Sequence, residues 1–308
     1  MTDTNARNQL SSLLLHLDGA YAPNTLRAYK ADMLEFVTYC DKASKCALPA
    51  DPNTVSDFLM QTMDKGIKSS TIRRKVSSIS AIHRLSCLPD PTKHSEVRIT
   101  QRKIYRQLGT RFDQAYPITK ALLTKLLNVC GDDLHGLRDR ALLMVAYDSM
   151  RRRSELIALR IEDIEWLADE GASILLRKSK TDQHGCGKWV HLAADTTAAL
   201  QAWIFAAQIN AGFIFRGIRP SGMITQSLCE SRISRIYKKL SRKAGLSEPI
   251  VEAISGHSMR VGGAQDLLQH GASLPQIMVK GGWAKTDTVM RYVERVNKPA
   301  ASNRSFSG

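Results

Sequence analysis

The sequence predicts a mainly α-helical protein of two domains, with a small antiparallel sheet set among the helices of the second domain. Helical periodicity dominates the chain, and only three short segments read as strands. The length of 308 residues suggests two domains rather than one. Hydrophobic residues make up 43% of the chain and charged residues 24%, so each domain can bury a core and the composition is not that of a disordered chain.

Two amphipathic helices are expected first. Residues 24–40 carry apolar side chains at helical spacing, with Asn24 as the expected cap. Asp51 and Pro52 are typical of a second helix start, and Gly66 is expected to end that helix.

Two basic helices follow. Over residues 68–85 an apolar stripe backs a basic, serine-rich face, and another basic helix is expected over about 94–107. A charged helix face is usually just solvated, but the crowding of cations here favours a DNA backbone or groove as the partner. The expected DNA contacts are Lys68, Arg73, Arg74, Lys75, Arg84, Arg98, Arg102, Lys103 and Arg106.

A linker is expected over residues 108–117, because LGTRFDQAYP lacks periodicity and ends in proline. This divides the chain into a helical DNA-binding domain over 1–107 and a second domain over 118–308. The second domain is expected to open with helices, one of them over 140–147. The expected strands cover 161–165, 173–176 and 189–192, with a polar hairpin turn over 178–185 before the helices resume near 196.

The net charge points to a polyanionic partner. Lys and Arg outnumber Asp and Glu by 44 to 29, which gives a formal charge of +15 and an isoelectric point near 9.7. No apolar run reaches the roughly 20 residues that a membrane helix needs, and the N-terminus has no signal-peptide pattern. We therefore expect a cytoplasmic protein associated with DNA and not with a membrane.

The cysteines do not suggest a metal site. All six are scattered without a C-x-x-C pair, as in a reducing compartment. His184, Cys186 and His191 lie close together in sequence, but a fourth zinc ligand at suitable spacing is missing. We expect no metal and no other cofactor.

The last quarter of the chain gathers side chains suited to phosphodiester chemistry. His257 and Arg260 lie one helical turn apart, and Trp283 and Tyr292 follow them. One side chain of such a set can attack a phosphate while the others hold and neutralise it.

Three consecutive arginines lie upstream, directly after an apolar helix. For Arg151 and Arg153 we expect an ordinary solvent-facing basic turn. Arg152 is different because it stands three residues before Glu155.

These motifs resemble the tyrosine recombinase (phage integrase) family. The likeness rests on Arg152-x-x-Glu155-Leu156, the hairpin Lys180, His257-x-x-Arg260, Gly-Gly-Trp283 and Tyr292, in that order. It is strongest to Cre-type recombinases, through AYDSMRRRSELIALRIEDI, SGHSMRVGGAQDL and GGWAKTDTVMRYV. AYAPNTLRAY and SSTIRRKVSSISAIHRLSCLPDP are similar to the family's DNA core-binding domain. Each motif alone is weak, but the ordered set is specific.

The resemblance implies a site-specific recombinase that cleaves and rejoins DNA through a 3′-phosphotyrosine and a Holliday junction, without metal or ATP. A free phenol has a pKa of about 10, so the tyrosine needs help to ionise. The implied roles are Tyr292 as nucleophile, Arg152 and Arg260 as phosphate clamp, Lys180 (with Lys178 as rival) as acid for the leaving 5′ oxygen, His257 as proton relay, Trp283 as phosphate donor, and Glu155 as support for His257.

It also implies a homotetramer on two inverted-repeat DNA sites, with each protein's two domains forming a clamp. The short polar tail after Tyr292 puts the family's docking helix in doubt, and we expect no additional arm-binding domain. Two alternatives remain: a DNA-binding protein that has lost catalysis, and a type IB topoisomerase. The intact set of site residues argues against the first alternative, and the core-binding helices argue against the second.

Overall fold

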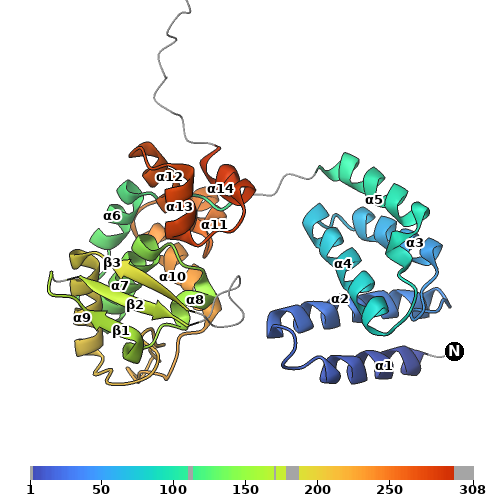
Figure 1. The fold of residues 1–308 in the computed structure, drawn as a ribbon, viewed down its shortest axis with the longest axis horizontal. Helices are drawn as coiled ribbons and strands as arrows, with labels where there is room; N and C mark the ends of the chain where they lie inside the picture. The colour runs from blue at the N-terminus through green and yellow to red at the C-terminus, as the bar shows by residue number, and fades with distance from the viewer. Residues whose placement is uncertain (1–2, 110–113, 170, 178–186, 295–308) are drawn as a thin grey trace, which may run out of the picture. The chain divides into compact units, whose positions relative to one another are not determined.

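The computed structural model describes residues 3–109, 114–169, 171–177 and 187–294. The chain forms two compact units, residues 1–113 and 114–308. Figure 1 shows that the first unit contains only helices and that the second combines helices with one sheet.

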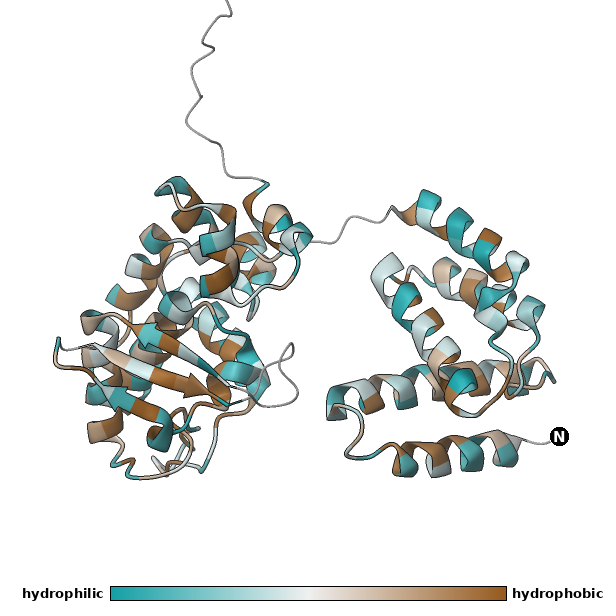
Figure 2. Ribbon diagram, viewed as in Figure 1, coloured by the Kyte–Doolittle hydropathy of each residue, from teal (hydrophilic) through white to brown (hydrophobic). Residues whose placement is uncertain are grey.

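The first unit is a bundle of helices around one apolar core. Figure 2 shows that its helices carry both hydrophobic and hydrophilic residues, as expected for amphipathic helices packed on a core. Its elements are α1 (Asp3–His16), α2 (Pro23–Lys42), α3 (Pro52–Asp64), α4 (Ser69–Leu85), a 3₁₀ turn (Pro91–Lys93) and α5 (Ser95–Leu108).

Local sequence signals explain most of these boundaries. The Asp51 carboxylate accepts from the backbone N–H groups of Asn53 and Thr54, at 2.9 and 3.2 Å, and caps α3 as expected. The expected cap at Asn24 is wrong, because α2 begins at Pro23 and its N-cap is Ala22. Helix α1 was not predicted at all.

Lys75 is not available to DNA. It lies three residues after Ile72 and four before Ile79, so it shares their inward face of α4 and is only 3% exposed. Its ammonium group forms ion pairs with Asp32 and Glu35 of α2. The expectation that Lys75 contacts DNA is therefore wrong, whereas Arg73, Arg74 and the other expected contacts are exposed.

The second unit is mainly helical with one three-stranded sheet. The sheet order is β1-β2-β3, antiparallel throughout, with Ile174 of β2 paired to Ile164 of β1 and to Val190 of β3. The strands are β1 (Ile164–Trp166), β2 (Ala172–Leu176) and β3 (Lys188–Leu192), and a 3₁₀ turn (Ile161–Asp163) stands where the first strand was expected to begin. The helices are α6 (Lys120–Asn128), α7 (Leu134–Ser149), α8 (Arg153–Ile157), α9 (Ala194–Ala206), α10 (Glu230–Lys243), α11 (Glu248–Ala253), α12 (Ser258–Gln269), α13 (Leu274–Gly281) and α14 (Thr286–Val293).

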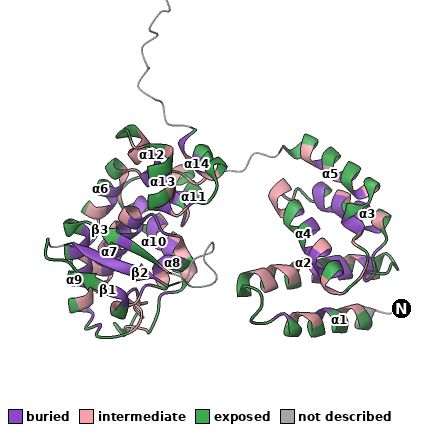
Figure 3. Cartoon of the chain, viewed as in Figure 1, coloured by how far each residue is buried: buried purple, intermediate pink, exposed green. Residues whose placement is uncertain are grey.

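The central strand β2 and helix α7 form the middle of this unit, where buried residues gather (Figure 3). A separate small apolar cluster joins the end of α7 to the C-terminal helices. Its buried members are Met150, Ala264, Ile277, Trp283, Val289 and Val293, with Tyr292 partly buried against them. This cluster fixes α12, α13 and α14 next to the turn that carries Arg152. The mainly helical fold with a small antiparallel sheet is confirmed.

None of the described helices combines the length and apolar character needed to cross a membrane. Within those same residues, no three His, Cys, Asp or Glu side chains lie where they would share a metal ion. His184 and Cys186 fall outside the described ranges.

Candidate functional site

Arg152 lies at the sharp turn between α7 and α8. Met150 ends α7 in the left-handed region, with φ of 49°, which is unusual for a residue other than glycine. Arg152 is the N-cap of α8, and its side chain keeps 21% of its surface exposed. The turn therefore presents this guanidinium at the surface of the site.

Glu155 orients Arg152. One carboxylate oxygen accepts from the Arg152 backbone N–H at 3.0 Å, and the other accepts from Nη1 of the same residue at 2.8 Å. Burial would raise the pKa of Glu155, but the bonds from Arg152 and the charges of Arg152 and Arg260 outweigh burial and leave the pKa below its ordinary value. Glu155 therefore supports Arg152, and its expected support of His257 stays a prediction.

Arg260 lies in the first turn of α12 and is 1% exposed. Its Nη1 donates to the carbonyl oxygen of Met150, and its guanidinium carbon lies 4.6 Å from the centre of the Trp283 ring. Burial lowers the pKa of Arg260 to about 10, and the charge of Arg152 adds to that effect. The two guanidinium groups therefore repel each other electrostatically, although they come from segments more than 100 residues apart.

Trp283 and Tyr292 complete the group. Their rings meet edge to face, with centres 5.7 Å apart and planes at 65°. The phenol of Tyr292 also acts on the Arg260 charge, and raises the pKa of that arginine. Gln265 of α12 donates to the backbone carbonyl of Tyr292 at 2.9 Å and fixes α14 against α12. No local sequence pattern indicates this role of Gln265.

His257 is exposed at the N-terminal end of α12, three residues before Arg260. Its backbone N–H donates to the hydroxyl of Ser255 at 3.2 Å. Of the seven expected catalytic residues, the structure brings together Arg152, Glu155, Arg260, Trp283 and Tyr292, through α8, α12, α14 and the segment after α13. His257 lies one helical turn before Arg260. Lys180 and its rival Lys178 lie outside the described residues.

Arg151 and Arg153 do not form a solvent-facing turn, so that expectation is wrong. Arg151 is 4% exposed and donates to the carbonyl oxygens of Ser149 and Lys280. The side chain of Arg153 has one third of its surface exposed and interacts with Ser234 and Glu230 of α10. This turn continues directly from the buried end of α7, so Met150 and Arg151 are buried as well.

The site holds more positive than negative charge. Arg151, Arg152 and Arg260 interact electrostatically, and Glu155 is the carboxylate that acts on all three among the described residues. The N-terminal end of α12 adds the positive end of its dipole near Arg260. Buried cations in such excess are costly unless an anion joins them. The site is therefore suited to an anion, with a phenol beside it.

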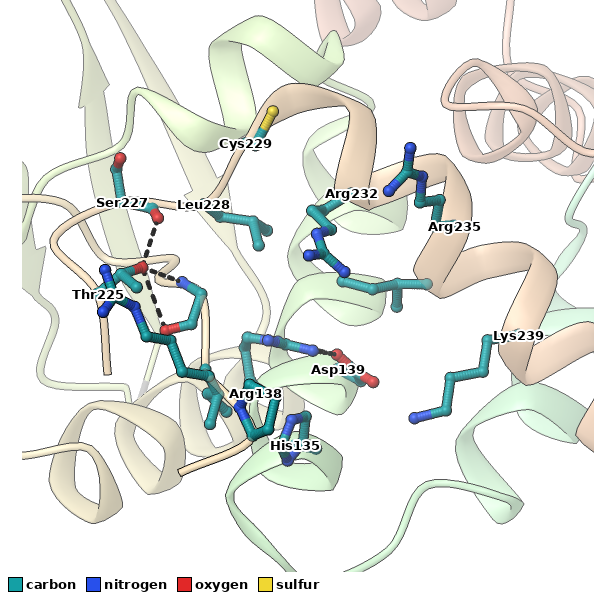
Figure 4. A pocket seen from close by; sticks show the side chains of 15 residues that line it. His135, Arg138, Asp139, Thr225, Ser227, Leu228, Cys229, Arg232, Arg235 and Lys239 are labelled. Carbon is teal, nitrogen blue, oxygen red and sulfur yellow. Dashed lines mark hydrogen bonds and ion pairs between the residues drawn. The ribbon is translucent and has the colours of Figure 1, made fainter. Parts of the chain in front are cut away.

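A second basic surface surrounds α10. A cleft of about 500 Å³ opens there, lined by His135, Arg138, Arg232, Arg235 and Lys239 (Figure 4). Arg138 is buried and paired with Asp139 at 2.6 Å, whereas Arg232, Arg235 and Lys239 are exposed. This surface was not predicted from the sequence. The signal was present, because Ile233, Ile236, Tyr237 and Leu240 form an apolar stripe with the cations outside it.

Comparison with known proteins decides the family. The model described as "Phage integrase family" matches residues 117–298, and "Phage integrase, N-terminal SAM-like domain" matches residues 13–86. The chain is 32% identical over 304 residues to the integrase/recombinase xerD homolog of Selenomonas ruminantium, covering 94% of this chain and 88% of the relative. The chain belongs to the phage integrase family. It is a tyrosine recombinase, an enzyme that cleaves and rejoins DNA.

Other members of the phage integrase family give the same assignment. Recombinase cre of Escherichia phage P1 is 25% identical over 294 residues, covering 90% of this chain and 86% of the relative. The resemblance to the family is confirmed, with the Cre likeness one among several. The Tn1549 transposon integrase, solved with transposon right-end DNA, shares the fold with a TM-score of 0.67 and 14% identity, over 93% of this chain and 94% of that one.

Proposed function

We propose that Tyr292 is the nucleophile of this recombinase. The phenolic oxygen would attack the scissile phosphorus, the bond from phosphorus to the 5′ oxygen would break, and a 3′-phosphotyrosine would form. Reversal by a second 5′ hydroxyl would rejoin the strand, so the bond energy is kept and no ATP is needed. The observation that carries this proposal is the edge-to-face contact of the Tyr292 ring with Trp283, whose ring also holds the Arg260 guanidinium, all inside one subunit.

Arg152 and Arg260 form the proposed phosphate clamp. Guanidinium groups donate in a planar fork that suits two phosphate oxygens. Each fork is already held, Arg152 by Glu155 and Arg260 by the Met150 carbonyl. A clamp that is fixed before the reaction stabilises the charge that grows on the phosphate in the transition state.

Protons are the remaining requirement. We propose that His257 takes or relays the proton of Tyr292, since it is exposed beside the clamp at the start of α12. Lys180 is proposed to protonate the leaving 5′ oxygen, and Trp283 to donate its indole N–H to the phosphate. The positive charge in this scheme comes from side chains and not from a metal ion.

A covalent adduct tests the function. The protein is incubated with nicked duplexes that carry candidate inverted-repeat sites, in the presence of EDTA, and the products are separated under denaturing conditions. We expect a protein–DNA adduct without metal. Binding without any adduct would contradict the proposal and indicate a DNA-binding protein that has lost catalysis. Relaxation of supercoiled DNA by single copies, without site pairing, would indicate a topoisomerase.

We propose that the recombinase holds DNA with both units, residues 1–107 and 118–308, joined by 108–117. The support is the pair of exposed basic faces, one on α4 and α5 and the other on α10. Since phosphate contacts release counterions, we expect log affinity to fall linearly and steeply with log salt, by about 0.9 for each contact. The measurement is a fluorescence anisotropy titration at several salt concentrations.

A matched lysine pair sharpens that measurement. Lys103→Ala, on the exposed face of α5, is expected to lower the salt slope by about 1. Lys75→Met removes a buried lysine, so the slope is expected to stay unchanged while the unfolding midpoint falls. A flat salt response of the native protein, or equal slopes for all three proteins, would contradict the two-surface proposal.

We also propose that four copies assemble on two DNA sites. The support is an exposed apolar groove of about 510 Å³ between β3 and α13, where Trp189 and Val279 keep 44% and 67% of their surface exposed. A neighbouring copy of the chain would cover it. Mass photometry on DNA that carries two inverted-repeat sites is expected to show four copies, and two copies at saturation would contradict the tetramer.

A further inference from the structure

Arg151 has unusual partners for a buried arginine. Its Nε donates to the carbonyl oxygen of Ser149 at 2.9 Å, and its Nη2 donates to the carbonyl oxygen of Lys280. These two carbonyls belong to the end of α7 and the end of α13, which are 131 residues apart in the chain. Among the described residues, no carboxylate forms an ion pair with Arg151.

Burial of this charge is costly. Burial lowers the pKa of Arg151, and the nearby charge of Arg152 lowers it further, while Glu155 opposes both. The carbonyl end of α13 offsets part of the cost, because a cation at a helix C-terminus meets the negative end of the dipole. Lys188 also binds the C-terminal end of α13, where its ammonium group donates to the Val279 carbonyl oxygen at 2.7 Å.

The end of α13 sets the position of Trp283. Gly282 is in the left-handed region with φ of 66°, and a Cβ on it would lie 2.9 Å from Nη1 of Arg151. A Cβ on Gly281 would lie 1.9 Å from the Trp283 ring. The chain therefore passes tightly between the Arg151 guanidinium and the indole, and the position of one constrains the other.

We infer that Arg151 is a positioning residue for strand cleavage: its fork joins the turn that carries Arg152 to the segment that carries Trp283. Through Trp283 it fixes the indole against Arg260 and the Tyr292 ring. This inference rests on the proposed function of those residues. A displacement of about 1 Å in such a group can reduce the rate by about 10²-fold.

Three variants test the inference. Arg151→Met keeps an unbranched stem and removes the donors, and Arg151→Lys keeps the charge but loses the planar fork whose Nε and Nη2 bind the two carbonyls. Arg7→Met is the control, because Arg7 of α1 pairs with Asp41 of α2, and these two helices carry none of the proposed DNA contacts or site residues. Each is compared with the native protein in single-turnover cleavage at saturating protein, in DNA affinity, and in ¹⁹F NMR after 5-fluorotryptophan labelling.

For Arg151→Met we expect cleavage to fall about ten- to a hundredfold, with DNA affinity within about threefold of native. The Trp283 resonance, assigned with Trp283→Phe, should move, while that of the core residue Trp203 should stay in place. Arg151→Lys should be intermediate, and Arg7→Met should behave as native.

Several results would overturn the inference. One is a native cleavage rate for Arg151→Met, or an unchanged Trp283 chemical shift in that variant. Another is a native cleavage rate for Arg151→Lys. A Trp203 resonance that moves together with that of Trp283 would show general misfolding. If the native protein forms no adduct, the proposed function fails. The Trp283 resonance still reports on the contact with Arg151 in that case, so the two failures are distinguishable.

Discussion

Tyr292→Phe is expected to abolish the covalent adduct and leave DNA binding near native. The substitution removes one oxygen and keeps the ring, so the edge-to-face contact with Trp283 and the packing of α14 remain. Loss of a nucleophile typically lowers the rate by a factor on the order of 10⁴ to 10⁶. Affinity should stay within about threefold, because no other contact of the side chain changes. Denaturing gel electrophoresis on nicked duplexes measures the adduct, and anisotropy measures binding.

Tyr237→Phe is the matched control. Tyr237 is fully buried in α10, and its hydroxyl has no hydrogen-bond partner among the described residues, so removal of that oxygen should cost no stability and no activity. Native adduct yield is expected from this variant. An adduct from Tyr292→Phe, or its loss from Tyr237→Phe, would show that the nucleophile is assigned to the wrong residue.

The periodicity of the sequence was sufficient for most of the fold. The helix starts at Pro52 and the antiparallel pairing of β2 with β3 follow from local patterns, because capping and alternation act over a few residues. Helix α1 was missed, since its stability comes from burying Leu10 against the rest of the bundle. Tertiary packing of this kind leaves a weak local signal.

In the site, too, some features follow from the sequence and others only from tertiary packing. The resemblance supplied its residue types, and the structure brings five of the seven together. It also shows two features that were not predicted: Glu155 binds Arg152, and Arg151 is buried. The Arg152–Glu155 pair is an i,i+3 contact that spacing along the chain could indicate. Spacing could not show the burial of Arg151, because that depends on a left-handed turn at Met150 and on carbonyls at the end of α13. The burial of Lys75 was predictable from the sequence, because its helical spacing from Ile72 and Ile79 places it on the apolar face of α4.

Arg260→Lys is expected to reduce cleavage by about 10²- to 10³-fold, the usual cost of losing one preset transition-state donor. Lysine keeps a positive charge but not the planar fork that holds the Met150 carbonyl and stacks on Trp283. The measurement is single-turnover cleavage at saturating protein, with the unfolding midpoint recorded in parallel.

Arg152→Lys provides the comparison. Its side chain is partly exposed and held by Glu155, so this variant should remain well folded while it loses cleavage by a similar factor. The double variant should lose less than the product of the two single losses, because groups that act on one phosphate are not additive. Strict multiplication of the losses, or native cleavage by either single variant, would mean that the two arginines do not grip the same phosphate.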